Sequence, residues 1–301
     1  MKKAKKIAKQ DKKRKKQLME IKAKKLRKIK YVLNSDREQY ASNWSNENAV
    51  FHENNGHYEW MADFIDDYKK VIEIGTGDGR GTLSLAKRGH FIISVDENPI
   101  CLQMANNRLK ENDVKVILLT REKVLRSGSF YRIEYEEINV NIDDYDVILI
   151  EGDIIYDQNL ISWLVENGPY DAVACWLIGT HSSKGNNENV SKDSIDSSQH
   201  YRLKTQNIVY ETADNILRSG GVLHVVDRGE VPESELLQKD FFQSHQDQAS
   251  VTSLEVQSLD WIEYKETESQ NAIEMVVAIP ISGRNPKLDK LALQSVISLK
   301  P

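Results

Sequence analysis

The sequence predicts an α/β protein with a doubly wound, mostly parallel sheet and a separate basic arm at its N-terminus. From residue 70 onward, short apolar runs alternate with segments of helical periodicity, a pattern typical of parallel strands joined by helices. Near the C-terminus, two apolar runs at 253–264 and 272–279 follow each other without a helix between them. We expect this last pair to be antiparallel, so that an antiparallel strand closes one edge of the sheet.

The charge of the chain is distributed very unevenly. The 301 residues have a net charge of −5, but residues 1–30 hold 16 Lys and Arg against only 2 acidic residues. The remaining 271 residues therefore carry 25 basic and 44 acidic side chains, a net of −19. We expect residues 1–30 to form a flexible or helical arm, either a solvated tail or a contact for a polyanion such as RNA or the ribosome.

Composition also excludes several classes of protein. No apolar run reaches the roughly 18–20 residues of a membrane span, so we expect no membrane contact. The basic N-terminus lacks the apolar stretch of a secretory signal, and two cysteines, Cys101 and Cys175, are too few for a disulfide framework. A cytoplasmic protein is the expectation. No set of His, Cys, Asp and Glu has metal-ligand spacing, so we predict no metal site.

The remaining elements follow in chain order. Residues 31–69 should form helices that precede the sheet, one of them starting at Ser35 as its N-cap. Strands are expected at 70–75, 91–95, 146–151, 171–178 and 222–226, and helices at 82–88, 99–112, 159–166 and about 200–218. Residues 114–120 and 131–138 should form a strand pair or an inserted hairpin. The polar loop 179–199 has the length of a substrate lid.

The most informative segment is VIEIGTGDGRG at 71–81, where an apolar strand runs into alternating glycines and then a helix. Glycines allow a tight turn and let the backbone approach a ligand closely. The dinucleotide fingerprint G-x-G-x-x-G fails in every register, because Arg80, Thr82 and Ser84 stand where its last glycine is needed. A P-loop fails as well, since no Lys-Ser/Thr follows. Glu73, just before the turn, disfavours a pyrophosphate and favours a cationic ligand.

This turn, EIGTGDG at Glu73–Gly79, resembles the first motif of class I S-adenosylmethionine (SAM)-dependent methyltransferases. The later segments FIISVDENP, VILIEGDI, DAVACW and LRSGGVLHVVD resemble that family's following motifs in the same order. The resemblance covers roughly residues 70–281, which would form the methyltransferase domain, with 282–301 as a C-terminal tail. It implies a Rossmann-like sheet of seven strands, SAM as cofactor, and in-line methyl transfer to an acceptor.

The resemblance also implies roles for individual residues in holding SAM. Glu73 and the turn glycines Gly75, Gly77 and Gly79 would surround its methionine end, and Asp96 would hold the two ribose hydroxyls. Asp153, after the predicted third strand at 146–151, would lie near the adenine amine. If 114–119 is the third strand instead, Thr120 or Arg121 takes the adenine position and Asp153 moves to the catalytic mouth; we favour Asp153 at adenine.

Candidates for the acceptor side lie on and after the predicted fourth strand: Asp171, Trp176 and His181. His181 is the candidate catalytic base for a hydroxyl or amine acceptor, with a hydrogen-bonded loop histidine as the alternative. Cys175 lies in an apolar strand and should be an inert buried thiol. The acceptor is not identified by the sequence and could be a small molecule, a protein or RNA. The alternative function is a non-catalytic protein of the same fold that binds the cofactor or tethers to RNA or the ribosome.

Overall fold

The computed structural model describes residues 2–265, 269–273 and 290–301. Its centre is an eight-stranded sheet with the strand order β3-β6-β2-β1-β7-β8-β10-β9, accompanied by a separate hairpin of β4 and β5. The strands are β1 Lys70–Ile74, β2 Phe91–Asp96, β3 Val116–Leu119, β4 Glu122–Ser127, β5 Phe130–Tyr135, β6 Val147–Glu151, β7 Tyr170–Trp176, β8 Leu217–Glu230, β9 Glu255–Tyr264 and β10 Leu291–Leu299.

Helices connect most of these strands. The α-helices are α1 Lys2–Asn43, α2 Val50–Asn54, α3 His57–Asp63, α4 Arg80–Lys87, α5 Pro99–Glu111, α6 Gln158–Glu166, α7 Glu188–Lys192, α8 Ser198–Ile216 and α9 Glu235–Ala249. Three short helical turns complete the description: the π-helix η1 Trp44–Ala49 and the 3-10 turns η2 Ile142–Asp144 and η3 Ser182–Asn186. No helix in these ranges is both long and apolar enough to cross a membrane.

The sheet confirms the doubly wound, mostly parallel arrangement expected from the sequence. In the spatial order of this sheet, the neighbouring strands β3, β6, β2, β1, β7 and β8 all pair in parallel. β10 runs antiparallel to both β8 and β9. The antiparallel strand therefore lies one position inside the edge. The sheet has eight strands rather than the seven implied by the resemblance, because β3 adds to the outer side of β6.

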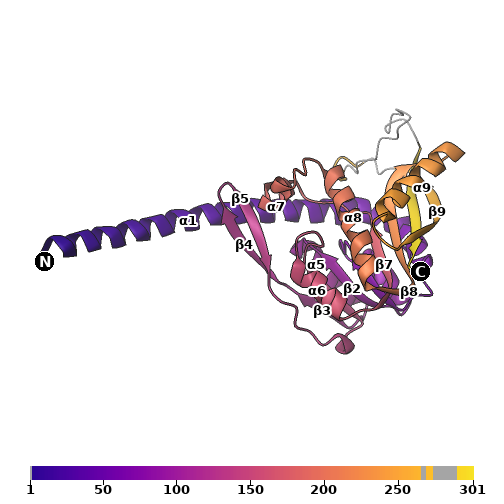
Figure 1. The fold of residues 1–301 in the computed structure, drawn as a ribbon, viewed down its shortest axis with the longest axis horizontal. Coiled ribbons are helices and arrows are strands. Elements are labelled where there is room, and N and C mark those ends of the chain that lie inside the picture. The colour runs from indigo at the N-terminus through magenta and orange to yellow at the C-terminus, as the bar shows by residue number, and fades with distance from the viewer. Residues whose placement is uncertain (1, 266–268, 274–289) are drawn as a thin grey trace.

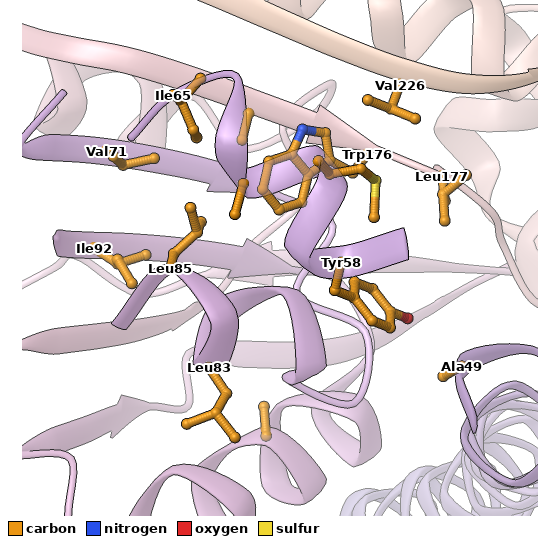
Figure 2. Packing of buried hydrophobic residues seen from close by; sticks show 14 of the residues in the cluster. Ala49, Tyr58, Ile65, Val71, Leu83, Leu85, Ile92, Trp176, Leu177 and Val226 are labelled. Atoms are coloured by element: carbon orange, nitrogen blue, oxygen red, sulfur yellow. The ribbon is translucent and has the colours of Figure 1, made fainter. Parts of the chain in front are cut away.

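Alternating side chains of each parallel strand enter two separate hydrophobic layers. On β1, Val71 packs with the cluster that contains α4 and α5, whereas Ile72 packs with the cluster that contains α6 and α8. On β2, Ile92 and Ile93 divide in the same way, as the two-residue period of a strand requires. Figure 2 shows the first layer, in which Leu85 of α4 lies against these two strands. Both faces of the sheet are thus covered, and its carboxyl-end edge remains for a ligand.

The basic arm is helical and residues 31–63 are largely helical, as expected, but the expected boundary between the arm and the following helices is absent. Residues 2–43 form one continuous helix, and Ser35, expected as an N-cap, lies in its interior. The reason is that this stretch contains neither glycine nor proline, so nothing interrupts the helix. The body also supports its last turns: Leu33 is buried, and the buried Arg37 pairs with Glu122 on β4 at 2.9 Å.

The expected pairing of 114–120 with 131–138 was also wrong. Val116–Leu119 forms β3, which pairs in parallel with β6 in the main sheet. The hairpin partner of β5 is β4 at 122–127, a segment the sequence did not indicate as a strand because charged residues interrupt it.

The C-terminal boundary needs a correction as well. Residues 291–299, expected in a tail, form β10 and pair along their full length with β8 and β9. Most of the strand expected at 272–279 lies outside the described residues. The run LALQSVISL is buried on both faces, so it has no alternation of polar and apolar residues to mark it as a strand.

Candidate functional site

A pocket of about 900 Å³, its open mouth included, lies at the carboxyl ends of β1, β2, β6 and β7. This is the edge where open parallel sheets bind their ligands. Its wall includes the predicted residues Glu73, Gly75, Gly77, Asp96, Asp153, Trp176 and His181. Seven residues from four strands and their following loops thus meet in one place.

The glycine turn is built as the sequence predicts. Gly75, Gly77 and Gly79 all have positive φ angles, +93°, +54° and +84°, which are strained for any residue with a side chain. Gly79 does not line the pocket, and a Cβ there would lie 2.7 Å from Ala105 of α5. Gly79 therefore serves the packing of α4 on α5, whereas Gly75 and Gly77 shape the pocket wall.

Glu73 is almost completely buried at the end of β1, with 2% of its surface exposed. Its Oε2 accepts hydrogen bonds from Thr82 Oγ1 on α4 at 2.6 Å and Ser94 Oγ on β2 at 2.5 Å. Burial raises the pKa of Glu73 to about 7, although these two hydrogen bonds oppose the shift. The side chain therefore joins the turn to its neighbours and also presents a carboxyl group that titrates near neutral pH.

Asp96 ends β2 and holds the glycine turn from the other side. Its Oδ2 accepts from Gly77 N at 2.9 Å and its Oδ1 from Asn98 N at 2.8 Å. Burial raises the pKa of Asp96 to about 6 despite both donors. Because a carboxylate offers about four acceptor positions, each oxygen keeps capacity for one further donor.

The N-terminal helices close the pocket, with aromatic side chains that sequence reasoning had not assigned to it. Tyr40 of α1, Trp44 of η1 and Tyr58 of α3 line it. Figure 2 labels Tyr58 together with Trp176, which lines the pocket from β7. A Cβ at Gly77 would come within 3.1 Å of Trp44 Nε1, and one at Gly179 would collide with the Tyr40 hydroxyl. A weak signal in the sequence is that aromatic residues are absent from residues 1–30 and occur at 31, 40 and 44.

A buried cluster of charges forms the side of the pocket between β2 and β6. Lys184 of η3 places Nζ 2.6 Å from Glu97 Oε2 and 2.7 Å from Asp153 Oδ2. Burial would lower the pKa of Lys184, but Asp153 and Glu97 outweigh it and raise the pKa well above its ordinary value. Burial would likewise raise the pKa of Glu97, but Lys184 and His181 hold it well below its usual range. Sequence reasoning missed both Glu97 and Lys184.

This cluster leaves the carboxylate of Asp153 fewer free acceptor positions for a ligand. Besides Lys184, its carboxylate accepts from Ile155 N at 2.9 Å through Oδ1. The strand before it, β6, lies next to β2 as a third strand should, and β3 lies outside it. Arg121, the alternative at this position, instead pairs with Asp157 at 2.6 Å and is absent from the pocket wall.

His181 follows β7 and lies in the pocket wall with 1% of its side chain exposed. Its Nε2 lies 3.5 Å from Glu97 Oε1, and neither ring nitrogen makes a hydrogen bond within the described residues. Trp176, at the end of β7, donates from Nε1 to Nδ1 of His224 at 3.1 Å and turns its ring toward the pocket. Both residues therefore line the pocket at the carboxyl end of β7.

Asp171 does not belong to this site, and its prediction as a substrate-side residue was wrong. It lies at the amino end of β7, opposite the pocket, because the chain enters the strand there. Its carboxylate accepts from Lys69 N at 3.0 Å and Lys70 N at 2.8 Å, and pairs with Arg218 at 2.6 Å. These contacts tie the starts of β1, β7 and β8 together.

The segment after β7 is folded rather than an open loop. It contains η3 and α7, and Ser183, Lys184 and Asn187 are buried. Tyr201, on the first turn of α8, reaches the pocket wall. Cys175 is fully buried, and burial raises the pKa of its thiol, so it is not an activated nucleophile.

The pocket as a whole is acidic. Its wall contains five carboxyl groups, those of Glu73, Asp78, Asp96, Glu97 and Asp153. They outnumber the three cations that pair with them, Arg80 in the wall and Lys184 and Arg108 outside it. Arg80 is itself bound to Asp78 and to Glu53 at 2.7 Å. The described residues contain no group of three or more side chains arranged to hold a metal ion. A ligand with positive charge fits this wall better than a phosphate.

No family model and no curated protein matches the chain. Among solved structures, a TehB-like SAM-dependent methyltransferase from Corynebacterium glutamicum is 14% identical, with a TM-score of 0.43 over 89% of this chain and 99% of that one. The methyltransferase domain of bacterial CtHen1 is 12% identical, with a TM-score of 0.43 over 82% and 98%. A SAM-dependent methyltransferase from Methanosarcina mazei is 11% identical, with a TM-score of 0.42 over 79% and 96%.

Identities and TM-scores this low carry no argument about function. The architecture itself is specific: a glycine turn follows the central strand β1, an acidic residue ends the neighbouring β2, and an antiparallel strand is inserted beside the edge. The glycine turn and Asp96 are features that the sequence resemblance implied, and together they form a ligand site at the carboxyl ends of β1 and β2.

Proposed function

We propose that this protein binds SAM in the pocket and transfers its methyl group to an acceptor. The observation that carries the proposal is the pairing of the glycine turn after β1 with the half-buried Asp96 at the end of β2. The backbone of Gly77 and the carboxylate of Asp96 are joined by a hydrogen bond and open into the same acidic pocket.

The residues present fit SAM chemically. The cofactor carries a sulfonium and an amino group, and the carboxylates of the pocket wall suit both cations. Asp96 keeps acceptor positions for the two hydroxyls of a ribose. Asp153 has fewer free positions, because Lys184 and Ile155 already bind it. We assign Asp96 the ribose, and Asp153 the adenine side of the pocket.

Methyl transfer from a sulfonium needs alignment and the exclusion of water more than it needs acid or base chemistry, because bound SAM supplies an already activated methyl group. Tyr40, Trp44 and Trp176 provide the apolar walls that exclude water. The acceptor atom must then approach from the mouth beside the carboxyl end of β7. A second pocket there shares Tyr40, Trp44 and residues 177–180 with the first, and it is the entry we assign to the acceptor.

His181 is the residue we assign to proton removal from the acceptor. It is buried, its ring nitrogens have no hydrogen-bond partner among the described residues, and Glu97 lies 3.5 Å from Nε2. An imidazole in this position can take a proton from a hydroxyl or ammonium acceptor, and Glu97 stabilises the cation that results. Glu97 acts through His181 and is therefore a positioning residue.

Isothermal titration calorimetry with SAM tests the proposal. The full chain should bind SAM, and S-adenosylhomocysteine should compete for the same site. NAD should not bind, because the turn lacks the dinucleotide fingerprint and Glu73 stands beside it. Binding of NAD without binding of SAM would show that the site has been assigned to the wrong cofactor.

A further inference from the structure

A groove separate from the cofactor pocket lies between α1 and the β4–β5 hairpin. It has a volume of about 830 Å³, open side included, and it is formed by segments about 100 residues apart in the sequence. Ile29 and Leu33 on α1 pack against Val124 and Tyr131 on the hairpin, and Ile29, Leu33 and Tyr131 form an apolar part of the groove wall. Figure 1 shows the hairpin beside α1, at the point where the helix leaves the body of the protein.

The rim of this groove is basic. Lys25 and Lys28 from α1 and Arg126 from β4 line it, and all three are exposed. None of them forms an ion pair with a carboxylate in the part of the chain that the structure describes. Three cations from two different elements thus face one groove without neutralisation.

The basic character continues along the helix away from the groove. α1 contains 42 residues and is therefore about 63 Å long, and Figure 1 shows it projecting far beyond the body. Residues 1–30 hold 16 Lys and Arg and 2 acidic residues. A rod with this charge binds phosphate groups by releasing their counterions, and it does so without regard to sequence.

Two features favour an unpaired nucleic acid strand over a duplex. The rest of the chain carries a net charge of −19, which repels the broad phosphate surface of a duplex, whereas a single strand can follow the narrow groove. Phe130, at the turn of the hairpin next to Gly128 and Ser129 of the groove, has 38% of its surface exposed. An exposed aromatic ring beside a basic groove is a stacking surface for an unpaired base. Loops and ends of RNA present such bases.

We propose that unpaired RNA docks in this groove, with its phosphates on Lys25, Lys28 and Arg126 and a base stacked on Phe130. The floor of the groove includes Ser183 and Asn186 of η3, and the neighbouring residues 180 and 181 line the cofactor pocket. Docked RNA therefore contacts η3, which directly follows the pocket residues 180 and 181 in the chain. The docking itself does not require methyl transfer.

Fluorescence anisotropy of the full chain with a labelled oligouridylate of about 20 nucleotides tests this proposal, since single-strand sites cover roughly 4–16 nucleotides. The groove variant Lys25→Glu/Lys28→Glu/Arg126→Glu should bind at least about tenfold more weakly. The slope of log K against log salt should fall in magnitude by about 2, because each lost phosphate contact contributes roughly 0.7. Phe130→Ala should weaken binding at every salt concentration without changing the slope.

The matched control reverses three exposed lysines on the body, Lys87→Glu/Lys110→Glu/Lys239→Glu, and changes the net charge by the same amount. It should bind RNA within about twofold of the wild type. Thermal unfolding verifies that every variant is folded.

Equal loss in the groove and control variants would show a net-charge effect and overturn the groove. Loss only on deletion of residues 1–24 would overturn it too, since the arm alone would then account for binding. Duplex DNA bound as tightly as the oligouridylate would overturn the assignment to unpaired RNA. These outcomes are independent of SAM binding, so a failure here is distinct from a failure of the proposed function.

Discussion

Replacing Asp96 by alanine removes the carboxylate that connects the glycine turn to the cofactor. In the wild type, its two oxygens accept from Gly77 N at 2.9 Å and Asn98 N at 2.8 Å. We assign the remaining acceptor positions to the two ribose hydroxyls of SAM. Alanine takes away all four interactions but leaves a small, apolar residue that is compatible with the end of a strand.

The cost to cofactor binding follows from the two hydroxyl contacts. Each is a hydrogen bond to a charged group, which contributes about 1.5–3 kcal/mol, so both together contribute about 3–6 kcal/mol. At about 1.4 kcal/mol per factor of ten, the Kd for SAM should rise about 10²- to 10⁴-fold. The lower end is the better expectation, because burial raises the pKa of Asp96 to about 6 and its charged form is therefore already disfavoured.

Calorimetric titration with SAM measures this change, and Asp171→Asn is the matched control. Asp171 also accepts from two backbone N–H groups, those of Lys69 and Lys70, but at the opposite end of the sheet. Asp171→Asn should lower the free energy of unfolding and leave the Kd for SAM unchanged. A Kd within threefold of wild type in a folded Asp96→Ala protein would refute the ribose assignment.

Three further predictions follow from the charges of the site. The affinity for SAM should fall about tenfold per pH unit below about pH 6, because protonation of Asp96 removes the acceptor charge. Titrations at several pH values should show this slope in the wild type but not in Asp96→Ala. The same slope in both proteins would assign the pH dependence to another group. His181→Ala should lower kcat about 10²- to 10⁴-fold and leave the Kd for SAM unchanged. Single-turnover methyl transfer measures the rate. An unchanged rate would show that His181 is not the base. Lys184→Met leaves Glu97 and Asp153 without their cation and should lower the free energy of unfolding in urea by about 3–5 kcal/mol. As a control, substitution of the exposed Lys192 by Met should leave the urea midpoint unchanged. Equal effects of the two substitutions would mean that burial of the charge cluster does not matter.

The parallel part of the fold could be predicted because local signals there agree with one another. β1, β2, β6 and β7 are short apolar runs, and the first three end at a polar residue or a glycine turn. The glycine turn was predictable from its glycines, and Asp96 was expected because FIISVDENP resembles the second motif of the methyltransferase family. The structure shows the two in contact.

The elements that the sequence missed depend on contacts made at long range. β4 has charged residues along it and is a strand because it pairs with β5 and because Glu122 binds Arg37 from α1. β10 is buried on both faces between two strands, so it shows no alternation. Propensity alone cannot separate such segments from loops or tails, since tertiary packing decides them.

The same holds for the part of the site that was missed. Lys184 stands in a polar, Ser- and Asn-rich stretch that reads as a surface loop, but two carboxylates from β2 and β6 bury its ammonium. Asp171 was misplaced because its position in a motif says nothing about which end of the strand faces the ligand. The direction of the chain through β7 places Asp171 at the closed end of the sheet and Trp176 at the open end.

Transfer of radiolabelled methyl from SAM tests the central claim most directly. The full chain is incubated with labelled SAM and an extract of the source cells, and RNA, protein and small molecules are then separated and counted, with Asp96→Ala as the control. The account predicts label in one of these fractions, dependent on the wild-type protein and strongly reduced with Asp96→Ala. No label above the control in any fraction, from a protein that binds SAM in calorimetry, would contradict methyl transfer and indicate a non-catalytic SAM-binding protein.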